Sequence, residues 1–193
     1  MEEMAEKIRV CVQCPLWEKR KSAVPGDGDV NASVLFVGEA PGYWEDIKGM
    51  PFVGAAGRVL DALLEKIRLR RESVFITNVV KCRPPENREP RPLEIATCTS
   101  LYLNHQIHLV EPRIIVTLGR HATVYILSKA GVENVDSISW FRGRVYPVEF
   151  LGLSVAVVPM YHPASVLHNP GYRNDLENDF RLLKSELKRR RVR

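Results

Sequence analysis

The sequence has no long apolar run. No stretch of the 193 residues approaches the ~20 apolar residues that a membrane-spanning helix needs. The first six residues, 1–6, are acidic and lack the apolar segment that directs export. Internal repeats and low-complexity linkers are also absent. These features argue against a membrane protein or a repeat protein, and we expect a cytoplasmic protein with no membrane partner.

Several cofactor and metal motifs are also missing. The only glycine-rich segment that follows an apolar strand lacks the Gly-x-Gly-x-x-Gly order, and no Lys-Ser/Thr pair completes a phosphate-binding loop. The five histidines, at positions 105, 108, 121, 162 and 168, form no His-Glu-x-x-His set. The sequence therefore argues against a nucleotide cofactor and against a metal-dependent hydrolase.

The composition is that of an ordinary globular chain. With 193 residues and 45% hydrophobic residues, it can bury one substantial core, and we expect a single domain over 1–193. The net charge of +5 comes from the end of the chain, because residues 181–193 hold seven Lys or Arg against one Glu. This basic end is consistent with attraction to phosphates, and equally with a solvated helix end whose cations complement the helix dipole.

Strand and helix patterns alternate along the chain. Runs rich in β-branched and aromatic residues predict strands at 33–38, 74–77, 113–118, 144–148 and 153–158. Apolar residues three and four positions apart, together with Pro and Gly boundaries, predict helices at 57–69, 93–110, 119–131 and 172–190. We expect an α/β protein with three α/β/α layers around a central, mainly parallel sheet of about four strands.

The four cysteines are unevenly spaced. Cys11 and Cys14 form a Cys-x-x-Cys pair, whereas Cys82 and Cys98 stand far apart. Structural zinc sites usually combine two close pairs, so this spacing favours an iron–sulfur cluster over zinc. An alternative is that Cys82 and Cys98 are buried apolar residues while Cys11 and Cys14 are a redox pair or a disulfide.

Three segments with polar or glycine residues follow predicted strands. They are Gly38 to Gly42 after the first strand, Asn78 after the second and His162 after the last. Each alone is typical of a turn or a loop. Because ligands bind beyond the carboxyl ends of parallel strands, we expect the three segments to converge on one site.

The motifs together resemble a known family. The segments Gly38–Asp46, Pro51–Gly57, Thr77–Pro84 and Tyr161–Ser165, read with the four cysteines, are similar in order and spacing to family 4 of the uracil-DNA glycosylase superfamily. The resemblance covers residues 11 to about 173. It implies an α/β/α fold, removal of uracil from DNA, and a 4Fe-4S cluster held by Cys11, Cys14, Cys82 and Cys98.

Residue chemistry fits this activity at the base itself. Uracil presents an O4 acceptor beside an N3–H donor, and the carboxamide of Asn78 offers the complementary pair. Cytosine presents the inverse pair, so Asn78 would reject it. Phe52 is the expected stacking platform for the flipped base. Its alternative role is that of a core phenylalanine.

The resemblance also assigns the cleavage step. It places His162 as the hydrogen-bond donor to the uracil anion, and Glu39 is the candidate that positions or activates water. Glu45 is the alternative, either for water or for rejection of the thymine methyl. In another branch of the superfamily an Asp stands at Ala40 and a Tyr at Gly42, so both positions are expected to touch the substrate.

DNA contacts are expected outside the pocket. Lys81, Arg83 and Arg88 are candidates for phosphate contacts, and Leu167 is the candidate wedge for the gap that a flipped base leaves. No lysine occupies a motif position, so we expect an intact abasic site as product.

Alternatives remain open at this point. They are a glycosylase for another deaminated or mismatched base, and a non-enzymatic iron–sulfur DNA-binding module. We expect a monomer that acts on uracil-containing DNA, single- or double-stranded, with further repair or replication partners unidentified.

Overall fold

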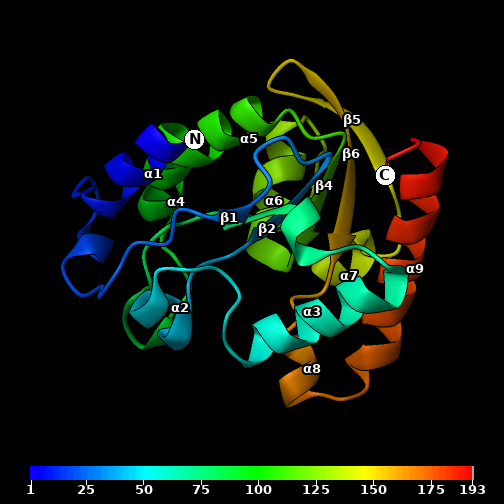
Figure 1. Ribbon diagram of the computed structural model, residues 1–193, viewed down its shortest axis with the longest axis horizontal. Helices are drawn as coiled ribbons and strands as arrows, with labels where there is room; N and C mark the ends of the chain where they lie inside the picture. Colours follow the sequence, from blue (N-terminus) through cyan, green and yellow to red (C-terminus); the bar gives the residue numbers. More distant parts are fainter. Residues whose placement is uncertain (193) are drawn as a thin grey trace.

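The computed structural model describes residues 1–192 of the chain. The strands in this part form one six-stranded sheet (Figure 1). Its strands are β1 (Asp27–Gly28), β2 (Val34–Gly38), β3 (Phe75–Asn78), β4 (Ile114–Leu118), β5 (Tyr146–Phe150) and β6 (Leu153–Met160). The order across the sheet is β1-β3-β2-β4-β6-β5. Arg193, the last cation of the basic end expected over 181–193, lies outside the described residues.

The expected number of about four strands is wrong. Four strands, β3, β2, β4 and β6, form a parallel centre, and the described part of the chain adds an antiparallel strand at each edge. β1 pairs with β3 over only two residues, an Asp and a Gly, which carry no β-branched or aromatic signal. β5 overlaps the strand predicted at 144–148 and pairs antiparallel with β6.

Helices cover both faces of this sheet. The described helices are α1 (Glu2–Arg9), α2 (Tyr43–Lys48), α3 (Ala55–Ile67), α4 (Pro92–Cys98), α5 (Asn104–Val110), α6 (Arg120–Lys129), α7 (Ile138–Phe141), α8 (Ser165–His168) and α9 (Tyr172–Arg189). α4 and α5 continue into one another through a π-helical segment, Thr99–Leu103, and together form the helix predicted over 93–110. Short 3₁₀ turns lie at Pro15–Trp17, Arg71–Ser73 and Pro85–Asn87.

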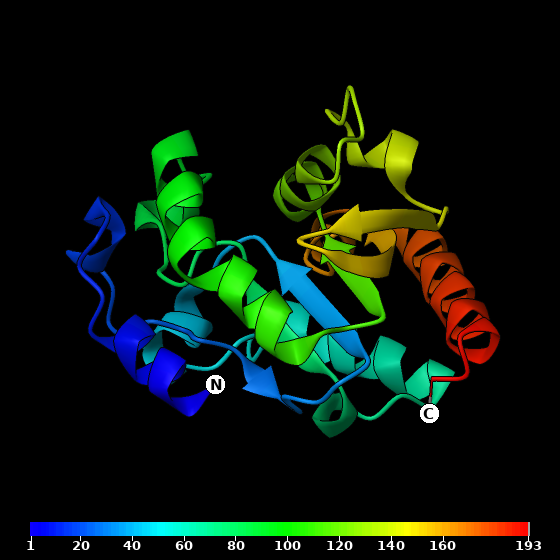
Figure 2. The same ribbon diagram turned by 90° about the horizontal axis from the view of Figure 1, so that it is seen from above.

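The alternation of strand side chains divides the core into two layers. Phe36 of β2 packs with α3 and α9 on one face, while its neighbours Leu35 and Val37 pack with α1, α5 and α6 on the other. Figures 1 and 2 show the sheet between these two groups of helices. The predicted three-layer α/β/α fold is therefore confirmed.

A buried polar network lies beside β3. Thr77 Oγ1 lies 3.0 Å from the carbonyl oxygen of Pro25 and 3.2 Å from Gln106 Oε1, and Gln106 Nε2 donates to the same carbonyl at 2.7 Å. Lys81 Nζ donates to Thr77 Oγ1 at 2.7 Å and to the carbonyl oxygen of Asn78 at 2.6 Å. The network fixes the loop around Pro25, the end of β3 and α5 to one another.

The four parallel strands end on the same edge of the sheet. Gly38 pairs in register with Asn78 across β2 and β3, and Leu118 pairs with Met160 across β4 and β6. The loops that follow these four residues therefore start side by side. Among the described residues no helix is long and apolar enough to cross a membrane.

Candidate functional site

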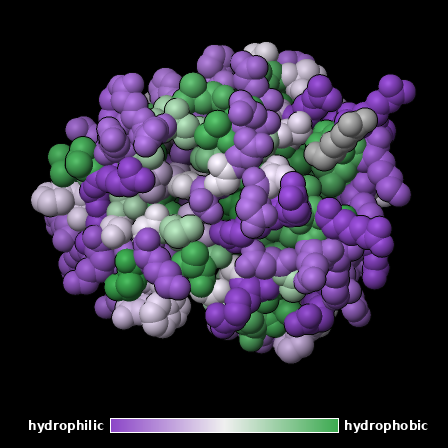
Figure 3. Space-filling model, viewed as in Figure 1, coloured by the Kyte–Doolittle hydropathy of each residue, from purple (hydrophilic) through white to green (hydrophobic). Residues whose placement is uncertain are grey.

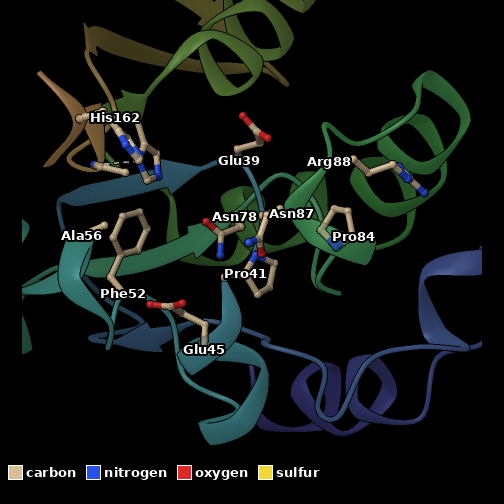
Figure 4. Close-up of a pocket in the computed structure, with 14 residues that line it drawn as sticks. Glu39, Pro41, Glu45, Phe52, Ala56, Asn78, Pro84, Asn87, Arg88 and His162 are labelled. Carbon is tan, nitrogen blue, oxygen red and sulfur yellow. Dashed lines mark hydrogen bonds between the residues drawn. The ribbon is translucent and has the colours of Figure 1, made fainter. Parts of the chain in front are cut away.

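A cavity of about 360 Å³ opens beyond the carboxyl ends of the parallel strands (Figure 4). Its lining includes all seven residues that the sequence placed at the substrate: Glu39, Ala40, Gly42, Glu45, Phe52, Asn78 and His162. They come from the loops after β2 and β6, the start of α2, the segment before α3, and the end of β3. The expected convergence of these segments is thus present in the fold.

Asn78 is the most buried polar group of this cavity. Its exposed fraction is 1%, and its Oδ1 has no hydrogen-bond partner within the described chain. A Cβ at Gly38 would lie 2.3 Å from this oxygen, so only glycine lets the end of β2 approach Asn78. Leaving a buried acceptor unpaired costs about 1–3 kcal/mol. A ligand with a donor directed at Asn78 would recover this cost.

Phe52 stands over the same cavity in a constrained conformation. Its φ is 51°, a left-handed value that is unusual for a bulky residue. Arg71 holds the segment, because its guanidinium donates to the carbonyl oxygens of Pro51 at 2.6 Å and Phe52 at 3.3 Å. A Cβ at Gly57 would lie 1.9 Å from the Phe52 carbonyl oxygen, so α3 can pass this close only with glycine there.

His162 lies against Phe52 in the wall of the cavity. The ring centroids are 5.5 Å apart with 28° between the planes. The backbone N–H of Ala164 donates to His162 Nδ1 at 3.1 Å, which leaves the proton of the neutral ring on Nε2. Burial lowers the pKa of His162, while the carboxylates of Glu39 and Glu45 act in the opposite direction. The ring is thus a neutral Nε2–H donor at neutral pH.

Glu39 is held by a histidine from α6. Glu39 Oε2 lies 2.7 Å from His121 Nδ1, and the side chain of His121 is only 11% exposed. Arg120 Nη2 lies 3.2 Å from His121 Nε2 and also pairs with Glu89 at 2.8 Å. Because a carboxylate oxygen can only accept, Nδ1–H of His121 donates to Glu39. One carboxylate oxygen of Glu39 is thereby fixed, and no bond within the described chain engages Oε1.

Glu45 fastens the loop before α3. Its Oε1 accepts from the backbone N–H groups of Val53 and Gly54, both at 2.9 Å. Its Oε2 lies beside Gly42, where a Cβ would come within 2.8 Å of it. Glu45 therefore shapes the wall of the cavity and sets the entry to α3 through Oε1, while Glu39 is held from α6 through its Oε2.

The expected DNA contacts lie in different surroundings. Lys81 is 1% exposed and its ammonium is bound in the Thr77 network, so the expected phosphate contact of Lys81 is wrong. In the sequence, Lys81 stands in a segment that resembles a polar loop, which suggested an exposed side chain. Arg83 donates to Asn87 Oδ1, Arg88 forms a bidentate pair with Glu94, and Leu167 on α8 is 50% exposed.

The four cysteines converge around one small cavity on the other side of β3. Cys11, Cys14, Cys82 and Cys98 all line it, together with Arg20 and Tyr102, and all four are free thiols. Within residues 1–192 no group of three or more His, Cys, Asp or Glu side chains is arranged to hold a metal ion. In a 4Fe-4S cluster each iron binds one cysteine thiolate, so the four sulfur atoms lie farther apart than the ligands of a single metal ion.

The surroundings of these thiols suit bound anionic sulfur. Arg20 Nη1 donates to Cys82 Sγ at 3.0 Å, and the backbone N–H of Lys81 donates to Cys98 Sγ at 3.3 Å. Burial raises the pKa of the Cys82 thiol and that of Cys98 to about 12. Buried thiols of this kind are not exposed redox sensors in the free state, and a group that stabilises thiolates would fit among them.

His121 was missed by the sequence analysis, although a signal was present. It follows Gly119 at the carboxyl end of β4, the same kind of position that identified Asn78 and His162. Gly119 has φ +94°, and a Cβ there would lie 3.2 Å from His162 Cβ, so this turn brings β4 and the His162 loop together. Asn87 and His168 also line the cavity without having been proposed as pocket residues.

Fold and site together define a class: a three-layer α/β protein with a buried polar pocket beyond the carboxyl ends of its parallel strands. Comparison with known proteins makes the class specific. The family model described as the uracil DNA glycosylase superfamily matches residues 25–187. The chain therefore belongs to the uracil DNA glycosylase superfamily.

Individual relatives place the chain within that superfamily. A type-4 uracil-DNA glycosylase of Saccharolobus solfataricus is 50% identical over 185 residues, which is 95% of this chain and 85% of that protein. A type-4 uracil-DNA glycosylase of Archaeoglobus fulgidus is 46% identical and covers 94% of this chain and 90% of its own. A type-5 uracil-DNA glycosylase of Thermus thermophilus is 33% identical over 76% of this chain and 71% of its own. Type-4 proteins are thus the more similar of these relatives.

Proposed function

We propose that the chain hydrolyses the N-glycosidic bond of uracil in DNA. The observation that carries this proposal is the orphaned Oδ1 of Asn78, buried in a cavity that the rings of Phe52 and His162 also line. Such a cavity suits a flat ligand that supplies a hydrogen-bond donor. Membership of the superfamily and the names of the type-4 relatives support uracil as that ligand.

Recognition of uracil follows from the amide of Asn78. Its Oδ1 accepts from N3–H of the base, and its NH₂ donates to O4. Cytosine has an amino donor at that position and an acceptor at N3, so it would leave both amide groups unpaired in a buried site. Phe52 offers the stacking face, and Arg71 holds Phe52 in place.

Departure of the uracil anion is assisted by His162. Bond cleavage places negative charge on the base and positive charge on the sugar. The proton on Nε2 of His162 is available because Ala164 occupies Nδ1. A donor that is oriented before the reaction stabilises the anion without a reorganisation cost.

Glu39 is the residue we assign to the water. Its Oε2 is fixed by His121, and its Oε1 has room to accept a proton from a water molecule. We assign Glu45 to the cavity wall instead, because its Oε1 accepts the two backbone N–H bonds that hold the segment before α3. Its Oε2 lies at the Gly42 side of the cavity and is proposed to crowd the position where thymine carries a methyl group.

The product is proposed to be an intact abasic site. Strand cleavage through a Schiff base needs a lysine amine at the sugar. None of the cavity-lining residues of the described chain is a lysine, and the ammonium of Lys81 is bound to Thr77 and Asn78 on the other side of β3. The residues assigned to recognition and cleavage, Asn78, His162 and Glu39, need no residue of a second copy, and we propose that the enzyme acts as a monomer.

Cys11, Cys14, Cys82 and Cys98 are proposed to hold a 4Fe-4S cluster. The cluster would tie the N-terminal segment to β3 and α4 and needs to supply no electrons, because hydrolysis of the base is not a redox reaction. The test is elemental analysis and visible absorption of anaerobically purified protein. About four irons per chain with a broad visible shoulder support the cluster, whereas zinc in both aerobic and anaerobic preparations contradicts it.

The activity is tested with matched oligonucleotides that carry one uracil, thymine, cytosine or hypoxanthine, as single strands and duplexes. Free base and alkali-labile sites are measured separately. We expect release of uracil alone and strand breakage only after alkali. Release of a different base would keep the glycosylase and overturn the Asn78 argument. Binding without release by protein with a full complement of iron would instead favour a non-enzymatic DNA-binding module.

A further inference from the structure

Two exposed aromatic side chains stand beside the mouth of the cavity. Tyr43 is 53% exposed and Trp44 is 54% exposed, on the first turn of α2. Their rings meet edge to face with centroids 5.2 Å apart. Figure 3 shows pale and hydrophobic atoms at the surface over α2, surrounded by hydrophilic ones. Large aromatic groups have a cost in water, so a pair of them here points to a ligand.

The aromatic pair is connected to both sides of the pocket. Gly42 and Glu45, which flank the pair in sequence, line the cavity. The guanidinium of Arg83 lies over the Tyr43 ring at 5.3 Å, and Arg83 also donates to Asn87, a residue of the cavity wall. Trp44 approaches the start of α3, where its Cδ1 lies 3.5 Å from a Cβ built on Gly54. A DNA strand that leaves the cavity on this side would therefore pass over the rings of Tyr43 and Trp44.

The charge around the pair suits a polyanion. Arg83 is half-buried at Tyr43, and Lys48 is exposed on the same helix as Trp44. The one Asp of α2, Asp46, is buried and accepts from the backbone N–H groups of Lys21 and Ser22. The exposed residues of α2 thus combine two aromatic rings with Lys48, and Arg83 adds a cation at Tyr43 from the loop after β3. Aromatic rings beside cations are the combination that binds single-stranded nucleic acid.

We propose that Tyr43 and Trp44, with Arg83, form a stacking platform for unpaired bases next to the uracil in single-stranded DNA. The inference rests on the proposed function for the position of the strand. Bases in a duplex already have both faces covered by their neighbours, so they offer no free face to these rings. The platform therefore favours single-stranded over duplex DNA, and it is separate from Phe52, which serves the flipped base inside the cavity.

The test uses Tyr43→Ala/Trp44→Ala and the matched control Trp140→Ala. Trp140 is 77% exposed on α7 and lines no part of the cavity. Fluorescence anisotropy measures the Kd of each variant for three uracil-free probes: a single-stranded oligothymidine, an oligomer of the same length in which every base is absent, and a duplex. We expect the double variant to bind oligothymidine about tenfold more weakly, since one stacked base supplies that much. Trp140→Ala should bind all three like the wild type.

The oligomer without bases separates stacking from phosphate attraction. Its Kd should be the same for the wild type and for the double variant, and Trp44→Phe should retain most of the affinity for oligothymidine. Unchanged binding of oligothymidine, or an equal loss for the probe without bases, would overturn the platform. A thermal unfolding scan shows whether the variants are folded.

The binding measurements with uracil-free probes test the platform independently of the proposed function. Uracil release from a single-stranded substrate by the wild type tests the activity, and the uracil-free probes test the platform. A wild type that releases no uracil would defeat the proposed function while the anisotropy still decides the platform.

Discussion

Thr77 and Asn78 are consecutive buried polar residues of β3, and their surroundings differ sharply. Thr77 belongs to a network in which Gln106 and Lys81 find partners among neighbouring groups. Asn78 points to the opposite side of the strand and leaves its Oδ1 without a partner in the described chain. The first arrangement stabilises the fold, whereas the second retains binding capacity for a ligand. Burial alone does not distinguish the two, but satisfaction of the polar atoms does.

The difference extends to the backbone around each residue. Around Asn78, close approach depends on Gly38 and Gly57 and on the left-handed conformation of Phe52. Strain of this kind persists only where the surrounding structure imposes it, and it is concentrated at sites of function. The comparison therefore predicts that substitutions on the pocket side change activity, while those on the network side change stability.

The largest effect is expected at His162 in the pocket. His162→Ala removes the proposed donor to the uracil anion, and loss of one such donor costs about 10²–10³-fold in rate. Single-turnover release of uracil from an oligonucleotide measures it, with His108→Ala, an exposed residue of α5, as control. A rate within a few-fold of the wild type would remove His162 from the mechanism.

His162 also gives the pH dependence a sign. Burial lowers its pKa from an ordinary value near 6.5, so the unfolded chain binds this proton more readily than the folded chain. The contribution of the neutral ring to stability is complete above the unfolded pKa and is lost as the pH falls below about 6.5. His162→Gln should therefore unfold with a shallower acid dependence than the wild type, as followed by circular dichroism.

Asn78 gives the next effect and sharpens the comparison. Asn78→Ala removes two hydrogen bonds to uracil, each worth about 1–3 kcal/mol in a buried site, and should slow uracil release about a hundredfold. Because the Oδ1 it removes has no partner, the free energy of unfolding should not fall. Urea denaturation of both proteins checks this second part. A marked loss of stability would show that Asn78 is a structural residue like Thr77.

Gln106 is the reverse case. Gln106→Leu keeps most of the volume but withdraws the donor to the Pro25 carbonyl and the partner of Thr77. We expect a loss of about 1–3 kcal/mol in the free energy of unfolding, with Tm lower by about 2–4 °C for each kcal/mol. The single-turnover rate per folded molecule should remain that of the wild type. A selective loss of rate would mean that the network also serves the pocket.

The sequence was informative where a local pattern coincides with a physical requirement. Apolar runs ending in glycine or polar residues located the parallel strands and their loops, and with them Asn78 and His162. β1 gave no such signal, because its two residues pair only through the backbone. Lys81 was predicted to be exposed, because the sequence gives no sign that its ammonium group points inward and donates to Thr77. Hydrogen bonds between side chains of segments far apart in the sequence could not be predicted either.

The smallest effect is expected from such a distant pair, Glu39 and His121. The bond of 2.7 Å between Oε2 and Nδ1 orients Glu39 without touching the substrate, so His121 is a positioning residue. His121→Ala should slow uracil release about tenfold, the equivalent of one charge-assisted hydrogen bond of about 1.4 kcal/mol. The Kd for uracil-containing DNA should be unchanged, and His121→Gln, which keeps a donor, should restore part of the rate. Because both residues act on one carboxylate, adding His121→Ala to Glu39→Gln should cost little further. Full additivity of the two losses would instead show that His121 acts apart from Glu39, through α6 alone.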